Sequence, residues 1–299
     1  RVMDLLEQKP NVVDRTDVLR KYGDAFSPNK GNWEKIQGDI VFEDVSFMYP
    51  DGKEYVLEHF NLHVPAGMNV AIVGETGAGK STLVNLVGRF FEPTKGRILI
   101  DGVDYRERSQ LWLHSQIGYV LQNPHLFSGT VRENIRYGRL DASDEEIEEA
   151  ARNVSADMVV AKMEKGYDSD VGESGGLLST GEKQLISFAR AVLANPAIFV
   201  LDEATSSIDT QTEKLIQDAT NHLLKGHTSF VIAHRLSTIR QADLILVVKD
   251  GKIIERGSHP ELLEQKGYYY ELYSRQFEEE EAMKVFAGAT FAGETDWES

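Results

Sequence analysis

The sequence predicts an α/β fold, with a core of alternating strands and helices and one inserted all-helical block. Short apolar segments such as residues 68–74 and 197–203 are typical of buried strands, and helical patterns follow both of them. Between about residues 123 and 192 the patterns are helical. Alternation around such a block indicates a sheet covered by helices, into which a helical unit is inserted.

Five strands are predicted in the first half of the chain. Residues 1–14 have the pattern of an amphipathic helix that stops near Pro10, and the polar stretch up to about Gly38 predicts a linker. A glycine-rich loop follows the third strand and leads into a helix that stops before Pro93. Apolar patterns place the strands at residues 40–49, 55–64, 68–74, 96–102 and 117–122.

The second half begins with helices and returns to alternation. Residues 143–163 are predicted to be helical and start with a capping box, and a second box, Ser179 with Glu182, starts the last helix of the block. Strands at 197–203, 228–234 and 244–250 alternate with helices. The last of these ends in a hairpin turn, Asp250–Gly251, and a third capping box starts a terminal helix over residues 258–276.

Composition excludes several classes of function. The chain has 299 residues, enough for one to two domains, and carries 32 basic against 48 acidic side chains, a net charge of -16. An acidic chain is not expected to bind nucleic acid or anionic membranes broadly. The sequence has no cysteine, which excludes disulfides and cysteine metal sites.

Targeting and membrane signals are missing from this stretch of sequence. No apolar run approaches the ~18–20 residues of a spanning helix, and no signal peptide is recognisable. The chain begins with Arg1 rather than Met, so we expect it to be a piece of a longer protein whose membrane segments lie elsewhere.

The segment GETGAGKS, Gly74 to Ser81, matches the phosphate-loop pattern G-x-x-x-x-G-K-[S/T] in full. It has the required context, with an apolar strand before it and a helix after it. Glycines let backbone N–H groups wrap a β-phosphate, Lys80 reaches the β- and γ-phosphates, and Ser81 can coordinate Mg²⁺. The segment therefore predicts a site for a magnesium nucleotide.

Two carboxylates, Asp202 and Glu203, end the buried strand at 197–203. Successive strand residues point to opposite sides, so the two cannot share one role. We expect Asp202 to hold Mg²⁺, directly or through water, and Glu203 to polarise the water that attacks the phosphate.

Three further side chains stand at strand ends. Gln122, His234 and Tyr49 each have an ordinary interpretation, as a surface amide, a satisfied polar group and a core aromatic. In an α/β core, however, ligands lie beyond the carboxyl ends of the strands. There Gln122 would reach Mg²⁺ or water, His234 the γ-phosphate, and the Tyr49 ring would stack on adenine.

Together these residues resemble the ATP-binding domain of an ABC transporter, from about Gly38 to Gln276. The resemblance implies a P-loop NTPase (RecA-like) core with an N-terminal antiparallel β subdomain and an inserted α-helical subdomain at about 123–192. It implies ATP and Mg²⁺ as ligands, catalysis by Glu203, His234 and Gln122, and metal ligation by Ser81, Gln122 and Asp202. The implied nucleotide contacts are Tyr49, Gly74, Glu75, Thr76, Gly77, Ala78, Gly79, Lys80, Ser81, Thr82, Gln122, Ser179 and Gly181.

The amino-acid sequences of several motifs are similar to those of ABC exporters. Residues 170–176 (DVGESGG) look like an exporter X-loop whose Glu173 faces the membrane domain, and the D-loop "SSID" (Ser206–Asp209) and residues 231–243 are similar to exporter segments. The resemblance implies that residues 1–37 link to a membrane domain, that 38–276 bind ATP and that 277–299 are a mobile acidic tail. It implies a place on the cytoplasmic side of the cell membrane. A soluble non-transport ABC ATPase and an importer ATPase remain as alternatives.

In this family two such domains pair head to tail, and each ATP lies between the phosphate loop of one domain and the signature motif of the other. The usual signature is L-S-G-G-Q, whereas Leu178–Glu182 reads L-S-T-G-E. Thr180 adds a side chain where backbone must approach phosphate, and Glu182 adds a carboxylate beside an anionic ligand. We therefore expect a heterodimer in which one ATP site is weakened, with a tolerant homodimer as the alternative. The same Ser179–Glu182 spacing is also simply a good helix start.

Overall fold

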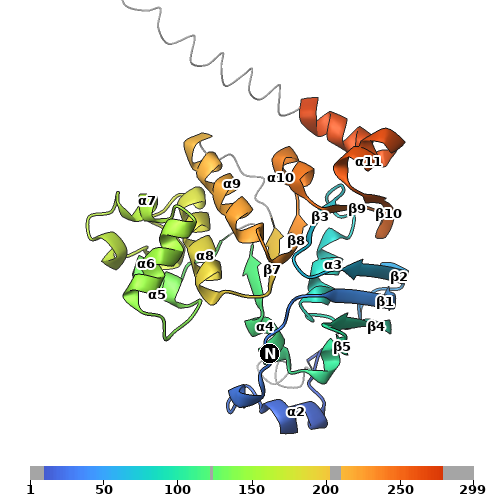
Figure 1. Ribbon diagram of the computed structural model, residues 1–299, viewed down its shortest axis with the longest axis horizontal. Coiled ribbons are helices and arrows are strands. Elements are labelled where there is room, and N and C mark those ends of the chain that lie inside the picture. Colours follow the sequence, from blue (N-terminus) through green and yellow to red (C-terminus); the bar gives the residue numbers. More distant parts are fainter. Residues whose placement is uncertain (1–9, 122–123, 203–209, 279–299) are drawn as a thin grey trace, which may run out of the picture.

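Two β-sheets and a group of helices make up the described part of the chain, which comprises residues 10–121, 124–202 and 210–278 of a computed structural model (Figure 1). Several predicted features lie outside the described residues. They are most of the helix predicted over the first residues, the side chains Gln122 and Glu203, the D-loop, and the tail beyond residue 278.

The larger sheet has six strands in the order β10-β9-β3-β8-β7-β6. All its neighbours pair in parallel except β10, which pairs antiparallel with β9. Asp250 and Gly251 join these two strands with positive φ angles of 49° and 74°, as a tight hairpin turn requires. The strands span Asn69–Val73 (β3), Ile117–Val120 (β6), Ile198–Asp202 (β7), Thr228–Ile232 (β8), Leu244–Lys249 (β9) and Lys252–Gly257 (β10).

Both faces of this sheet are covered, which explains its continuous apolar strands. On β7, Phe199 and Leu201 belong to the core on the helical side, whereas Ile198 and Val200 belong to the core shared with the second sheet. Asp202 continues the second set, because side chains alternate along a strand. The alternation therefore points Asp202 to the side on which the phosphate-loop helix lies.

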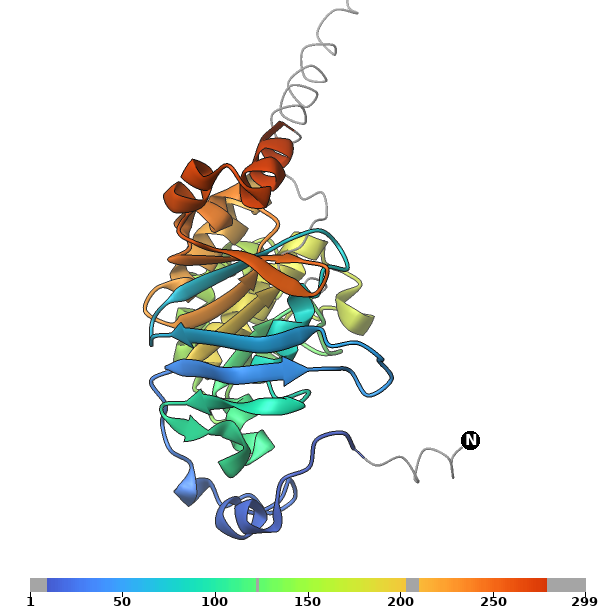
Figure 2. The same cartoon turned by 90° about the vertical axis from the view of Figure 1, so that its right-hand side faces the viewer.

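The smaller sheet is antiparallel, with strand order β2-β1-β4-β5, and confirms the predicted β subdomain. The core between the two sheets includes Leu83, Val84 and Leu86 from α3, so the helix that follows the phosphate loop is buried there. Figure 2 shows β1, β2 and β4 side by side. The strands span Ile40–Phe47 (β1), Leu57–Val64 (β2), Lys95–Ile100 (β4) and Val103–Asp104 (β5), and α3 spans Lys80–Val87.

The helical block, α5 to α8, gathers on the side of the large sheet away from the antiparallel strands (Figure 1), as predicted. The helix predicted over 143–163 is two helices, because Ser155 takes a left-handed conformation with φ 57°. Both predicted capping boxes form, at Ser143 with Glu146 and at Ser179 with Glu182. The helices span Val131–Arg136 (α5), Asp144–Asn153 (α6), Asp157–Val160 (α7) and Thr180–Ala194 (α8).

The terminal helix predicted over 258–276 is also divided. Lys266, with φ 50°, ends α11, and a second helix covers residues 268–278. Short 3-10 turns cover Lys30–Asn32, Tyr105–Glu107, Gly166–Asp168 and Glu173–Gly175. The remaining helices are Thr16–Tyr22 (α2), Gln110–Ser115 (α4), Thr210–Leu224 (α9), Leu236–Gln241 (α10) and His259–Gln265 (α11).

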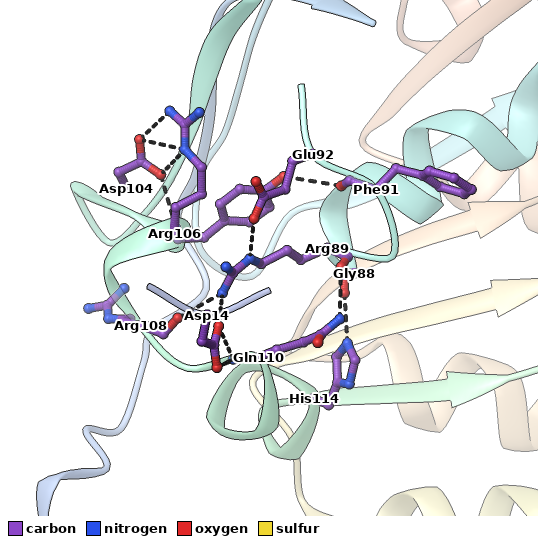
Figure 3. Close-up of polar contacts among 11 residues, drawn as sticks. Asp14, Gly88, Arg89, Phe91, Glu92, Asp104, Arg106, Arg108, Gln110 and His114 are labelled. Carbon is purple, nitrogen blue, oxygen red and sulfur yellow. Dashed lines mark hydrogen bonds and ion pairs between the residues drawn. The ribbon is translucent and has the colours of Figure 1, made fainter. Parts of the chain in front are cut away.

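The polar segment before β1 is held against the rest of the chain. Arg89, only 1% exposed, donates to the Asp14 carboxylate over 2.8 Å, and the same carboxylate accepts the backbone N–H of Gln110 (Figure 3). Further along the segment, Glu34 accepts a hydrogen bond of 3.1 Å from Arg108. Buried charge pairs therefore fix residues 14–34 to the region around α3 and α4.

Candidate active site

The phosphate loop runs from the end of β3 into α3, as predicted. Gly74 has φ 153°, and a Cβ there would lie 2.2 Å from the carbonyl oxygen of Val248. Gly79 has φ 103° and precedes α3, a conformation that other residues rarely adopt. The loop therefore needs glycine at both ends, for close packing at Gly74 and for the turn into the helix at Gly79.

Lys80 is buried inside this loop. Its side-chain nitrogen donates to the backbone carbonyls of Gly74 and Glu75, over 2.7 and 3.0 Å. Burial lowers the pKa of Lys80, and the nearby charge of Asp202 opposes that shift. A partly desolvated ammonium that donates to carbonyl groups is well placed to bind anionic phosphate oxygens instead.

A cavity of about 780 Å³ opens beside the loop and brings most of the predicted site together. Its lining includes Tyr49, the loop from Thr76 to Thr82, Asp202 and His234. These residues come from the segment after β1, the β3–α3 loop and the start of α3, the end of β7 and the segment after β8. Residues far apart in the sequence therefore share one cavity of a size suited to a small-molecule ligand.

Three ionisable side chains in the cavity lining, Lys80, Asp202 and His234, influence the pKa values in this site. Burial raises the pKa of Asp202, while His234 and Lys80 oppose that rise. Burial also lowers the pKa of His234, Lys80 adds to the effect, and Asp202 opposes it. Three buried ionisable groups that influence one another in a cavity are typical of a functional site.

The residues fit a magnesium ion that is bound together with phosphates. Ser81 and Asp202 offer a hydroxyl and a carboxylate oxygen to the same cavity. Mg²⁺ usually takes one or two such protein ligands and completes its shell with phosphate and water. No cluster of three or more His, Cys, Asp or Glu side chains that could hold a metal ion occurs in the described ranges.

Tyr49 stands at the rim with its ring held by other side chains. Its hydroxyl lies 2.9 Å from the Thr82 hydroxyl, and its ring meets Phe47 and Phe91 edge to face at 4.8 and 5.1 Å. A fixed ring beside the cavity is compatible with stacking on a base.

Several lining residues were not predicted from the sequence. Except for Ile232 at the end of β8, they lie in the β1–β2 connection and the β9–β10 hairpin, two segments with no chemical motif of their own. The hairpin turn was predicted, but nothing in its sequence indicates that it reaches the phosphate loop. The unpredicted lining residues are Glu54, Tyr55, Val56, Ile232, Asp250 and Gly251.

The signature segment lies elsewhere, at the start of α8, and Ser179 and Gly181 do not line the cavity. The Glu182 carboxylate accepts the Ser179 backbone N–H and the Ser179 hydroxyl, both over 2.9 Å. Ser179 and Thr180 are exposed, whereas Gly181 is buried. The proton of the Ser179 hydroxyl is thus engaged by Glu182 within the same helix start.

The fold and cavity define a P-loop nucleotide-binding domain, and comparison with known proteins gives its family. The family model described as ABC transporter matches residues 57–206. The chain therefore belongs to the ABC transporter family, as one of its ATP-binding, ATP-hydrolysing domains.

Relatives and a solved structure agree with this assignment. The ABC transporter ATP-binding protein YfiC of Bacillus subtilis is 50% identical over 279 residues, covering 93% of this chain and 44% of the relative. A fatty acid ABC transporter ATP-binding/permease protein of Mycobacterium bovis is 54% identical over 256 residues, covering 86% and 40%. The structure of a bacterial Atm1-family ABC exporter with ATP bound superposes with a TM-score of 0.78 at 39% identity, covering 92% and 46%.

The chain spans less than half the length of these relatives. Among the helices that the structure describes, none has the length and apolar character to cross a membrane.

Proposed function

We propose that this chain is the ATP-driven motor of an ABC exporter, on the cytoplasmic side of a membrane. The observation that carries the proposal is the cavity that the phosphate loop, with Lys80, shares with Asp202 and His234. The alternatives, a soluble ABC ATPase or an importer ATPase, receive less support, because the similar proteins named above are an ATP-binding/permease protein and an exporter.

In this mechanism this chain binds the adenine and the phosphates from the side of its phosphate loop, and a partner's signature completes the site. Tyr49 stacks on adenine, the loop N–H groups and Lys80 hold the phosphates, and Lys80 exchanges its two carbonyl acceptors for phosphate oxygens. Ser81, Asp202 and Gln122 would hold Mg²⁺, and the ion would supply positive charge that offsets the charge of the transferred phosphoryl group.

Hydrolysis needs a water and a residue that recognises the γ-phosphate. Glu203 orients and polarises the attacking water, as its place next to Asp202 predicts. His234 contacts the γ-phosphate from the end of β8. Both roles follow from the resemblance to the family, and the role of His234 is also supported by its place beyond the carboxyl end of β8.

The second part of the proposal is a heterodimer. The phosphate loop, Glu203 and His234 match the family pattern, but the signature helix is altered. The Ser179–Glu182 bonds support a weakened partner site, because they engage a hydroxyl proton that a partner's γ-phosphate would need and place a carboxylate beside it. The productive site of this chain then needs a standard signature from another subunit.

ATP hydrolysis by the chain alone and after mixing with a partner subunit tests the heterodimer. We expect low turnover alone and a large increase with a partner that carries the standard signature. Strong turnover of the chain alone, unchanged by Glu182→Gln, would refute the heterodimer and support a homodimer.

A further inference from the structure

The helix over residues 268–278 is firmly anchored at its start. The Glu255 carboxylate on β10 accepts the backbone N–H groups of Tyr268 and Tyr269, over 2.6 and 2.9 Å. Tyr269 is 1% exposed, and its hydroxyl lies 2.7 Å from Nδ1 of His259 on α11. Figure 2 shows these two terminal helices together at one end of the molecule, next to β10.

The last turns of this helix reach both walls of the ATP site. The side-chain amide of Gln276 donates a hydrogen bond to the backbone carbonyl of His234. The neighbouring Arg275 lies 3.4 Å from the carboxylate of Glu75, which belongs to the phosphate loop. One helix therefore touches the residue expected to meet the γ-phosphate and the loop expected to wrap the β-phosphate.

The Gln276 contact bears on the direction of the His234 side chain. His234 lies between the end of β8 and the start of α10, beyond the sheet hydrogen bonds that orient β8. A donor on its carbonyl fixes the following peptide plane and with it the backbone from which the imidazole projects. Gln276 is half-buried, which limits competition by water for that carbonyl.

The Arg275 contact affects the negative charge that Glu75 adds to the phosphate loop. Glu75 is a carboxylate in a loop that is built to bind an anion, and like charges weaken such binding. The guanidinium of Arg275 offsets that carboxylate. Because the side chains are 59% and 58% exposed, this effect is modest and screened by salt.

We infer that the C-terminal helix positions the ATP site, with Gln276 orienting His234 for the γ-phosphate and Arg275 neutralising Glu75 at the phosphate loop. The inference rests on the proposed function, because it assumes that His234 meets the γ-phosphate. It makes Gln276 a positioning residue, which acts through His234 and touches no nucleotide.

The test compares two ligands on the complete chain, a non-hydrolysable ATP analogue and ADP, each with Mg²⁺, by titration calorimetry. Gln276→Leu is expected to raise the Kd of the ATP analogue about three- to tenfold, the value of one hydrogen bond, and to leave the Kd of ADP unchanged. His234→Ala is expected to show the same selectivity, since only the analogue carries a γ-phosphate.

Replacements of matched size separate hydrogen bonding from packing. Gln276→Lys keeps a donor and is expected to bind both ligands like the wild type, whereas Gln276→Glu keeps the size, loses the donor and is expected to weaken the analogue at least as much as Gln276→Leu. Glu271→Gln, on the exposed surface of the same helix, is the control and changes neither Kd. Thermal unfolding of each variant establishes that it folds.

Arg275→Gln has a different expected signature. It raises both Kd values, about two- to fivefold, and the difference vanishes at high salt because the charges are exposed. A selective loss for the ATP analogue alone would overturn the role given to Arg275.

The outcomes distinguish the inference from the proposed function. A wild-type chain that binds neither ligand, or a His234→Ala variant that shows no selectivity, refutes the proposed ATP site and the inference with it. A selective effect of His234→Ala, combined with equal Kd values for Gln276→Glu and Gln276→Lys, leaves the ATP site standing and overturns the role of Gln276.

Discussion

At the scale of single residues, the chemistry of the site concentrates on Lys80, Asp202 and His234. Each is at least partly buried, Asp202 and Lys80 act on each other, and both act on His234. Lys80 is the most buried of the three, since it is 7% exposed, and it donates to two carbonyls of its own loop. We therefore expect some single substitutions to weaken nucleotide binding and others to slow hydrolysis.

Lys80→Ala is expected chiefly to abolish tight nucleotide binding, because the β- and γ-phosphates lose a buried cation. Calorimetry with Mg²⁺ and a non-hydrolysable ATP analogue measures it, and Lys214→Ala on the exposed face of α9 is the control. Unaltered affinity in Lys80→Ala would contradict the phosphate-loop interpretation.

Glu203→Gln is expected to leave ATP binding intact and to slow hydrolysis by about 10²- to 10⁴-fold, the usual contribution of a group that handles the reacting water. Phosphate release under saturating ATP measures it, with the exposed Glu164→Gln as the control. Glu203 lies outside the described residues, so this prediction depends on its place after Asp202. If the Glu203→Gln variant hydrolysed ATP at the wild-type rate, Glu203 would not be the residue that polarises the attacking water.

At the scale of elements, the predicted strands and capping boxes formed where the sequence patterns placed them, and two predicted helices were too long. Residues 143–163 and 258–276 carry continuous helical patterns, yet Ser155 and Lys266 adopt left-handed conformations that end a helix. The break at Ser155 has no strong local signal, because no glycine or proline is near it, whereas Gly267 directly after Lys266 is a sequence signal for a helix end. At Ser155 the direction of the next helix is decided by tertiary contacts.

The segment before β1 shows a similar limit of sequence reasoning. Its polar composition predicts a linker, but it contains α2 and is tied to Arg89 through Asp14 (Figure 3). Arg89 follows α3 closely, so the attachment lies at the far end of the helix that begins in the phosphate loop.

Asp14→Ala is expected to lower the free energy of unfolding by about 2 kcal/mol, because a hydrogen bond to a buried charge is lost while Arg89 keeps Glu92 and the Arg108 carbonyl. Urea denaturation measures the loss. Asp17→Ala breaks an exposed pair with Arg15 and is the matched control, with no measurable change expected. Equal stability of the two variants would show that the Asp14 contact is energetically neutral.

At the scale of the whole molecule, the phosphate loop and the signature segment of this chain do not line the same cavity. The cavity lies beside α3, while the signature helix α8 begins outside the lining of that cavity. In the proposed pair, a partner brings its signature to this cavity, and this chain's own signature serves the partner. Under that proposal, Thr180 and Glu182 affect the partner's ATP rather than the ATP held by Lys80.

Glu182→Gln, assayed in the assembled pair, is expected to increase total ATP hydrolysis, because it removes a carboxylate and releases the Ser179 hydroxyl at the weakened site. Hydrolysis by the pair before and after the exchange measures it. Glu146→Gln changes the same capping-box position on α6 and is the matched control for a pure effect on helix capping. If both exchanges changed hydrolysis equally, Glu182 would act only as a helix cap and not on the partner's ATP.

The sequence by itself determined the fold class, the phosphate loop, the paired carboxylates and the capping boxes, because each depends on residues close together in the chain. Local spacing carries that information, since strand alternation, helix capping and phosphate wrapping act over a few residues. The family followed from the order of those motifs.

Only the tertiary structure decided which distant residues meet. It brought Tyr49 to Thr82, added the β9–β10 hairpin to the cavity wall, and set Gln276 against the carbonyl of His234. It also turned Asp14 into the partner of a buried arginine. These contacts depend on how sheets and helices pack over long separations, and packing leaves no fixed spacing in a single sequence by which such pairs could be recognised.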